Sequence, residues 1–289
     1  YQNAFFVEVQ LHGGGCVLEE WRQSRKKRDS AHPMKTNPKE DPQSTLLRSV
    51  RVLFGLIEAG RPMTVTRLAT ALGLPASTTH RILNVLKDAG YVAQNEDSGA
   101  YGPGPALLRA SAMLSVAGTF QALVDATLAE LCERSGESAF YAAYLRESQR
   151  LRFVKTLHSH HAIQYVLRPE QTYSLLWGAT GDAIASCLPP QTLRAIYERD
   201  KDSGEGVAPV PDWETLQTHL RQVREQGHAI SHGQRHEGSF AIAAPVVDAQ
   251  GHPLGCVGIA MPASRHKPLN TPQSVELVTS AAERLCLAA

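Results

Sequence analysis

The chain has 289 residues, of which 43% are hydrophobic and 20% are charged, and its formal net charge is +1. This composition is typical of folded globular proteins and excludes a disordered or collagen-like chain. No apolar run approaches the roughly 18 residues of a membrane span, so we expect no membrane partner.

The cysteines predict neither a disulfide framework nor a thiolate metal site. They are odd in number, far apart in sequence and form no C-x-x-C pair. This usage fits a reducing compartment, and we expect a cytoplasmic protein. The five are Cys16, Cys132, Cys187, Cys256 and Cys286.

The first 43 residues do not have the pattern of a domain. They contain three consecutive glycines at 13–15, the basic run 25–28 and a stretch bounded by Pro33 and Pro42. We interpret residues 1–43 as a disordered tail or an extension before a start at Met34, because nothing in them can bury a core. The alternative is a basic arm that binds nucleic acid.

Residues 44–104 predict a winged helix-turn-helix. A helix over 44–59 has the apolar stripe Leu46, Leu47, Val50, Leu53, Phe54 and Ile57. Thr64 caps a short helix over 65–72, and the turn 73–75 leads into a helix that ends before Gly90. Two short strands around the polar turn 95–99 form the wing.

The helix after the turn has two different faces. Thr79, Ile82, Leu83 and Leu86 share the spacing of a packing face, whereas short polar and basic side chains follow the same spacing on another face. Between residues 44 and 90, six basic side chains outnumber two acidic ones, which favours contact with phosphates. The predicted DNA-contacting residues are Thr64, Thr66, Ser77, Thr78, Thr79, His80, Arg81, Asn84 and Tyr101.

The rest of the chain predicts a linker helix over 105–118 and an α+β domain over 119–289. In this second domain a long helix precedes two pairs of hairpin-connected strands, at 139–157 and 240–260, with helices between and after them. Such an order predicts a largely antiparallel sheet. The fold class is therefore a multi-domain α+β protein.

Signatures of catalysis and of cofactor binding are missing. The chain has no G-x-S-x-G, no Walker-type Gly-Lys-Ser/Thr, no H-E-x-x-H and no dinucleotide fingerprint. His228, His232 and His236 recur every four residues, but glycines interrupt them and no cysteine or carboxylate completes a ligand set. We therefore predict no catalytic residue, no metal and no cofactor.

The chain resembles the IclR family of bacterial transcription regulators from about Ser44 to its C-terminus. The resemblance rests on LPASTTHRILNVLKDAGYV (74–92), WGATGDAIASCLP (177–189) and VREQGHAISHGQRHEGSFAIAAPVVDAQGHPLGCVGIAMPASR (223–265). It implies a DNA-binding winged helix, a linker helix, a GAF-like domain that binds a small effector, and assembly into dimers or tetramers.

The resemblance also implies where the effector binds. Ser231, Ser239 and the backbone near Gly258 could bond a carboxylate, with Arg235 or His236 supplying positive charge. Trp177 is expected to narrow or reshape the pocket, and the small residues could equally serve close packing. The predicted ligand-binding residues are Trp177, Ala179, Thr180, Gly181, Ser231, Arg235, Ser239, Ala241, Gly258 and Ala260.

Two functions follow from this reading. The first is a regulator of a catabolic or metabolic operon that binds a near-palindromic double-stranded operator as a dimer or tetramer and senses a small organic acid, expected to be a carboxylate. The second is an enzyme or carrier that binds a small acid and uses its N-terminal module for dimerisation. DNA binding by residues 44–118 would favour the first, and turnover of a small acid by residues 119–289 the second.

Overall fold

A computed structural model describes residues 43–117, 119–161 and 171–288. The predicted tail or extension over residues 1–43 lies outside this range except for Gln43, which begins the first described helix. No helix of the described residues combines the length and apolarity that crossing a bilayer requires.

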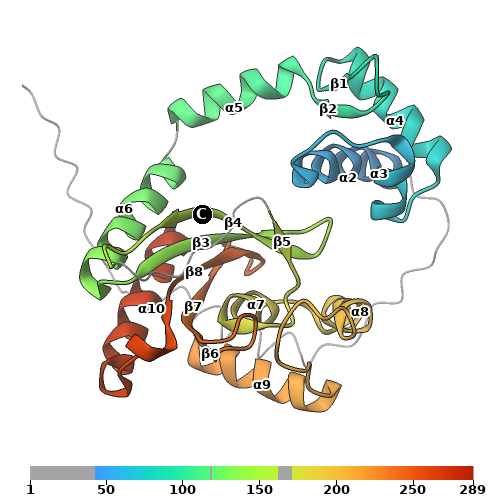
Figure 1. The fold of residues 1–289 in the computed structure, drawn as a ribbon. Coiled ribbons are helices and arrows are strands. Elements are labelled where there is room, and N and C mark those ends of the chain that lie inside the picture. Colours follow the sequence, from blue (N-terminus) through green and yellow to red (C-terminus); the bar gives the residue numbers. More distant parts are fainter. Residues whose placement is uncertain (1–42, 118, 162–170, 289) are drawn as a thin grey trace, which may run out of the picture.

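The N-terminal part of the described chain is a winged helix-turn-helix (Figure 1). Helix α2 (Gln43–Ala59) is followed by α3 (Val65–Leu72) and α4 (Ala76–Asp88), and the wing pairs β1 (Val92–Gln94) antiparallel with β2 (Tyr101–Pro103). The predicted order of helices, turn and hairpin is confirmed.

The turn between α3 and α4 depends on local hydrogen bonds and one glycine. The hydroxyl of Thr64 accepts the backbone N–H of Arg67 at 3.4 Å, as the predicted N-cap requires. Gly73 ends α3 with φ +63°, a left-handed conformation that glycine adopts without steric cost. These two residues define where α3 begins and ends.

The buried face of α2 differs from the one that its apolar stripe suggests. Val52 and Leu56, four residues apart, enter the small core with Leu68 and Leu83. Of the stripe, Leu53 is half-buried, and the other members are exposed: Leu46 (71%), Leu47, Val50, Phe54 (51%) and Ile57. Only one side of α2 contacts α3 and α4, so its more extensive apolar side faces away from them.

Helix α5 (Pro105–Ala117) leads from the wing to the C-terminal part of the chain (Figure 1). It matches the predicted linker helix. Helix α6 (Thr119–Ser135) then begins the α+β domain.

One six-stranded sheet organises the C-terminal part. Its strand order is β5-β4-β3-β8-β7-β6, and every neighbouring pair is antiparallel, as predicted. The short edge strands β5 and β6 were not predicted, because two and four residues carry too little alternation to recognise. The strands are β3 (Ser138–Leu145), β4 (Arg150–Leu157), β5 (Thr172–Tyr173), β6 (Ala229–His232), β7 (Ser239–Val247) and β8 (Pro253–Pro262).

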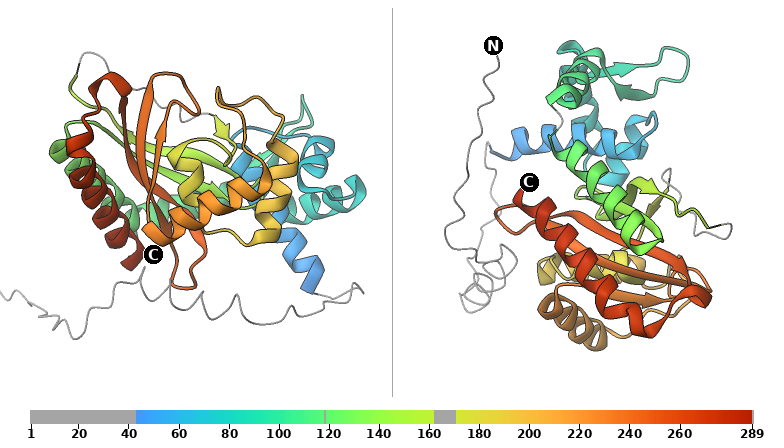
Figure 2. Two further views of the ribbon diagram at one scale, coloured as in Figure 1. Left: turned by 90° about the horizontal axis from the view of Figure 1, so that it is seen from below. Right: turned by 90° about the vertical axis from the view of Figure 1, so that its left-hand side faces the viewer.

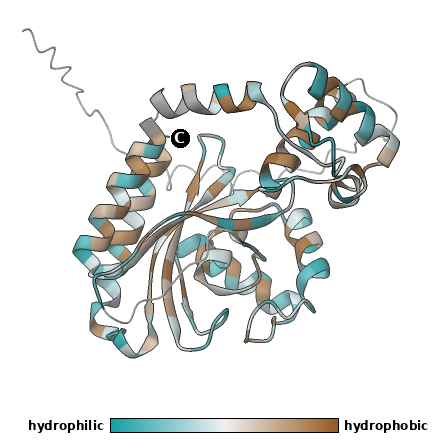
Figure 3. Cartoon of the chain, turned by 45° about the horizontal axis from the view of Figure 1, so that its top comes forward, coloured by the Kyte–Doolittle hydropathy of each residue, from teal (hydrophilic) through white to brown (hydrophobic). Residues whose placement is uncertain are grey.

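Helices cover both faces of this sheet (Figure 2). Helices α6 and α10 (Thr271–Leu287) pack on one face, and α7 (Gly178–Ala185), α8 (Pro190–Asp200) and α9 (Trp213–Gln226) lie on the other. Short 3-10 turns at Ala263–Arg265 and Pro268–Asn270 precede α10. Hydrophobic residues follow the strands, whereas the outer helices carry both kinds (Figure 3).

Alternation along the strands divides the core into two layers. On β3, Tyr141 faces α6 and α10, while its neighbours Phe140 and Ala142 face the α7–α9 side. Phe140, together with the start of α7, lines the cavity described below.

Candidate nucleic-acid interface and ligand pocket

Helix α4 presents a polar face to solvent. Ser77, His80 and Arg81 are exposed, and Thr78 and Asn84 are half-buried. No acidic residue lies in the first turn of α4, where backbone N–H groups and the helix dipole favour an anion. This face therefore combines hydrogen-bonding groups, a guanidinium and an anion-compatible helix start.

Two residues predicted to contact DNA are instead core residues. Thr79 is fully buried, and its hydroxyl donates to the carbonyl oxygen of Pro75 at 3.1 Å. Tyr101 is 1% exposed and packs against the core of the winged helix at the base of the wing. Because neither side chain reaches the surface, both predictions are corrected.

The start of α3 adds two exposed hydroxyls. Thr64 and Thr66 are both exposed, and Thr64 also caps the helix. They remain predicted phosphate contacts, at the N-terminus of the helix that precedes α4.

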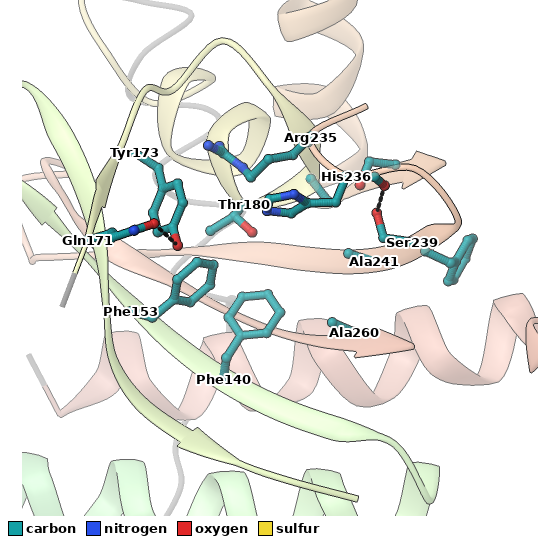
Figure 4. Close-up of a pocket in the computed structure, with 14 residues that line it drawn as sticks. Phe140, Phe153, Gln171, Tyr173, Thr180, Arg235, His236, Ser239, Ala241 and Ala260 are labelled. Atoms are coloured by element: carbon teal, nitrogen blue, oxygen red, sulfur yellow. Dashed lines mark hydrogen bonds between the residues drawn. The ribbon is translucent and has the colours of Figure 1, made fainter. Parts of the chain in front are cut away.

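A cavity of about 330 Å³ lies between the sheet and the start of α7 (Figure 4). Seven of the ten residues predicted to bind a ligand line it: Ala179, Thr180, Ser231, Arg235, Ser239, Ala241 and Ala260. The main chain reaches this cavity at Gly178, whose φ of +79° is a left-handed conformation that favours glycine.

Arg235 provides a fixed positive charge at the cavity. Its Nη2 donates to the carbonyl oxygens of Ser174 at 2.9 Å and Trp177 at 2.6 Å, and the guanidinium lies 4.9 Å from the centre of the Tyr173 ring. These contacts hold the side chain in place although it is almost completely buried. A preorganised guanidinium is suited to a carboxylate.

Three aromatic rings form the wall that sequence reasoning missed. Phe140 and Phe153 contact edge to face with centroids 5.3 Å apart, and Phe153 contacts Tyr173 in the same way at 5.6 Å. The Tyr173 hydroxyl donates to Oε1 of Gln171 at 3.2 Å (Figure 4). Assigning alternate residues of the predicted strands to opposite faces would have found the two phenylalanines.

Three predicted ligand residues serve packing instead. Trp177 turns away from the cavity: its Nε1 donates to the Ala208 carbonyl oxygen at 2.7 Å, and its ring packs against Gly206. A Cβ at Gly181 would collide with the Leu175 carbonyl oxygen, and one at Gly258 with that of Ile242. Trp177 therefore does not narrow the cavity by lining it.

Gln234 does not line the cavity, but its side chain holds two segments that do. The side-chain oxygen of Gln234 accepts the backbone N–H of Gly178 at 2.9 Å. This bond joins the loop that carries Arg235 to the N-terminus of α7.

Two cysteines of the described chain, Cys187 and Cys256, are part of the hydrophobic core. Cys187 and Cys256 are fully buried, and burial raises the pKa of the Cys256 thiol, so it stays protonated rather than acting as a nucleophile. Within residues 43–117, 119–161 and 171–288, no three potential metal-ligating side chains gather.

Comparison with known proteins assigns both halves of the chain. Residues 45–96 match the IclR helix-turn-helix domain, and residues 116–287 match the C-terminal domain of bacterial IclR transcriptional regulators. The transcriptional repressor IclR of Escherichia coli K12 is 22% identical over 262 residues, which cover 91% of this chain and 96% of that protein.

Solved structures share the fold. A crystal structure from Silicibacter sp. TM1040, titled as an ICLR transcriptional regulator, has a TM-score of 0.67 at 21% identity and covers 83% of this chain and 95% of that one. An IclR homolog of Microbacterium hydrocarbonoxydans, solved in complex with 4-hydroxybenzoate, has a TM-score of 0.55 at 20% identity and covers 85% and 100%.

A winged helix joined to a small-molecule-binding α+β domain defines a one-component transcriptional regulator. The chain belongs to the IclR family, whose members combine a DNA-binding domain with an effector domain. Its relatives are transcriptional regulators and not enzymes, which decides against the enzyme alternative.

Proposed function

We propose that this regulator binds a near-palindromic operator of a catabolic or metabolic operon as a homodimer or tetramer, and that a small carboxylate in the cavity changes its affinity for that operator. A regulator of this kind acts in the cytoplasm, where bacterial DNA lies. Residues 44–104, 105–118 and 119–289 serve as the DNA-binding domain, the linker and the effector domain.

The exposed face of α4 supports the DNA-reading role. Arg81 matches the O6 and N7 acceptors of guanine, and Asn84 matches the N7 acceptor and N6 donor of adenine. Ser77 and Thr78 lie at the helix start, where side-chain hydroxyls and backbone N–H groups meet phosphates.

The exposed apolar side of α2 supports pairing of two chains. Five large hydrophobic side chains between Leu46 and Ile57 are exposed on one helix, which is more than scattered surface residues explain. Two-fold pairing would present two α4 helices to successive major grooves about 34 Å apart. The polar face of a single α4 helix can contact only a few bases. Pairing two such helices therefore also supplies specificity.

One observation supports the effector proposal above all others: hydrogen bonds hold the guanidinium of Arg235 in place at a cavity that three aromatic rings line. The guanidinium suits a carboxylate, and the wall formed by Phe140, Phe153 and Tyr173 suits a planar ring. The hydroxyls of Thr180 and Ser231 add polar partners along the same cavity. The 4-hydroxybenzoate complex of the Microbacterium homolog supports an aromatic hydroxy acid for this chain as well.

Thermal unfolding of the full chain tests this proposal with two matched probes, 4-hydroxybenzoate and the uncharged 4-hydroxybenzamide. A ligand at 100 times its Kd adds about 2.7 kcal/mol to the free energy of unfolding. We expect the acid to raise the melting temperature and the amide to have little effect. Equal stabilisation by both probes would contradict recognition of a carboxylate.

A further inference from the structure

The winged helix and the effector domain contact each other within one chain at the end of α2. The carboxylate of Glu58 accepts the backbone N–H of Ser148 at 3.1 Å, that of Glu147 at 3.4 Å and the Ser148 hydroxyl at 3.2 Å. Ser148 and Glu147 belong to the turn between β3 and β4. One α2 side chain therefore binds the tip of this hairpin.

Two arginines complete the contact from opposite directions. Arg51 of α2 donates to the Glu147 carboxylate at 2.8 Å, and Arg152 of β4 donates to the Glu58 carbonyl oxygen at 2.6 Å. Gly60 lies against Arg152, where a Cβ would come within 3.1 Å of the guanidinium. We call the set Arg51, Glu58, Glu147, Ser148 and Arg152 the interdomain latch.

The polar groups of the interdomain latch are partly shielded from water. Burial raises the pKa of the Glu58 carboxyl, and the N–H groups of the turn oppose this shift by bonding the ionised form. The same turn holds Gln149 at φ +54°, a left-handed conformation that residues other than glycine seldom adopt.

Strand β4 connects the latch to the ligand pocket. Phe153 forms part of the pocket wall, whereas its neighbour Arg152 points from the opposite face of β4 to α2. Arg152 is also paired with Thr172 of β5, whose neighbour Tyr173 lines the pocket. A change at the pocket wall therefore acts directly on the strand that carries the latch.

A chain of hydrogen bonds also connects the ligand pocket to β4. Arg235 at the pocket donates to the carbonyl oxygen of Ser174, and the Ser174 N–H donates to Glu205 at 2.9 Å. Glu205 in turn receives two hydrogen bonds, at 2.6 and 2.7 Å, from Arg150 of β4. Arg150 also donates to the Thr172 carbonyl oxygen, so this chain of hydrogen bonds from Arg235 reaches both β4 and β5.

We infer that Glu58 and Arg152 are positioning residues that fix the winged helix on the effector domain, and that occupation of the pocket shifts this latch through β4 and β5. The inference rests on the proposed function, since it supplies the element that the effector biases. The ligand changes the DNA-binding geometry only by its different affinity for the latched and unlatched states.

The experiment uses the full chain without DNA or effector. Spin labels at Thr70→Cys on α3 and Glu225→Cys on α9, with Cys16→Ser, report the interdomain distance after dilution with unlabelled protein. The other four cysteines are buried. Hydrogen exchange over residues 171–178 reports the pocket wall in the same variants.

The matched control is Lys155→Ala, which removes a cation from the same strand. Lys155 pairs with Asp125 of α6 at 2.9 Å, in the effector domain rather than the winged helix. We expect Glu58→Ala and Arg152→Ala to broaden the distance distribution and to raise exchange over 171–178 about fivefold, the effect of losing one hydrogen bond. Glu58→Gln keeps one acceptor oxygen. Its interdomain distance distribution and its exchange over 171–178 should therefore lie between those of the wild type and Glu58→Ala.

Unchanged distances in Glu58→Ala and Arg152→Ala would overturn the latch. Broadened distances without a change in exchange over 171–178 would overturn its coupling to the pocket. Because neither readout involves DNA or a ligand, a failure of the operator-binding proposal is seen separately, in DNA-binding assays.

Discussion

Nε2 of His219 on α9 lies 2.9 Å from Oδ2 of Asp182 on α7, two residues after Thr180, which lines the pocket. Asp182 is almost completely buried, and burial raises the pKa of its carboxyl while the His219 bond opposes this rise. The hydrogen bond to Asp182 in turn raises the pKa of His219 above its ordinary value. The pair joins α9 to the helix that forms the pocket floor.

The His219–Asp182 pair predicts a pH-dependent stability. Because its folded-state pKa is raised, His219 contributes stability that is complete below about pH 6.5 and is lost as pH rises through the folded value. The melting temperature of the wild type should therefore fall between about pH 6 and pH 8 more than that of His219→Gln. Parallel pH profiles of the two proteins would contradict the paired state.

Arg81→Ala and Asn84→Ala should each weaken binding to the specific operator by about 1–3 kcal/mol and relax base preference at one position per half-site. Arg221→Ala removes an exposed guanidinium of α9 and serves as the charge-matched control. Fluorescence anisotropy with operator and scrambled DNA measures both effects. Unchanged specificity in Arg81→Ala and Asn84→Ala would show that another face of the winged helix reads the bases.

Thr79→Val should reduce stability and leave DNA contacts in place. The change removes the hydroxyl bond to Pro75 inside the core, and we expect a loss of about 1 kcal/mol in the free energy of unfolding. Ser77→Ala, two residues away on the exposed side, should show the reverse pattern. Urea unfolding and operator binding of both variants separate the two roles.

Phe54→Glu should dissociate the paired state, because it places a charge in the exposed apolar side of α2. Leu269→Glu changes an even more exposed hydrophobic residue, at 95%, far along the chain, and should leave the mass unchanged. Light scattering after size-exclusion chromatography compares the two. If Phe54→Glu keeps the wild-type mass, pairing uses a different surface.

Local patterns predicted the elements of the winged helix well, and its packing less well. Periodicity locates α2, but it favours the longer apolar stripe over Val52 and Leu56, which form the buried side. Which side is buried depends on where α3 and α4 lie, and that is a tertiary property. Thr79 illustrates the same limit, since a short polar residue can complete a core when a nearby carbonyl accepts its hydroxyl.

Only part of the pocket was predicted from the sequence, and the reason is related. Resemblance located the segments around Ala179, Ser231 and Ala260, which the structure brings together at one cavity. It did not distinguish glycines that line a cavity from those, such as Gly258, that allow two strands to approach closely. The aromatic wall comes from Phe140 and Phe153, which lie on neighbouring strands and outside every matched motif.

The most direct measurement is the affinity of the wild type and of Ala241→Leu for an operator sequence obtained by binding selection. Each protein is measured with and without an aromatic carboxylate that stabilises the wild type. Ala241 lines the pocket, so a leucine there fills it without touching α4. We predict that the acid changes wild-type operator affinity about fivefold or more, and that Ala241→Leu binds the operator equally with and without it. An equal response of both proteins to the acid would contradict control of DNA binding from this pocket.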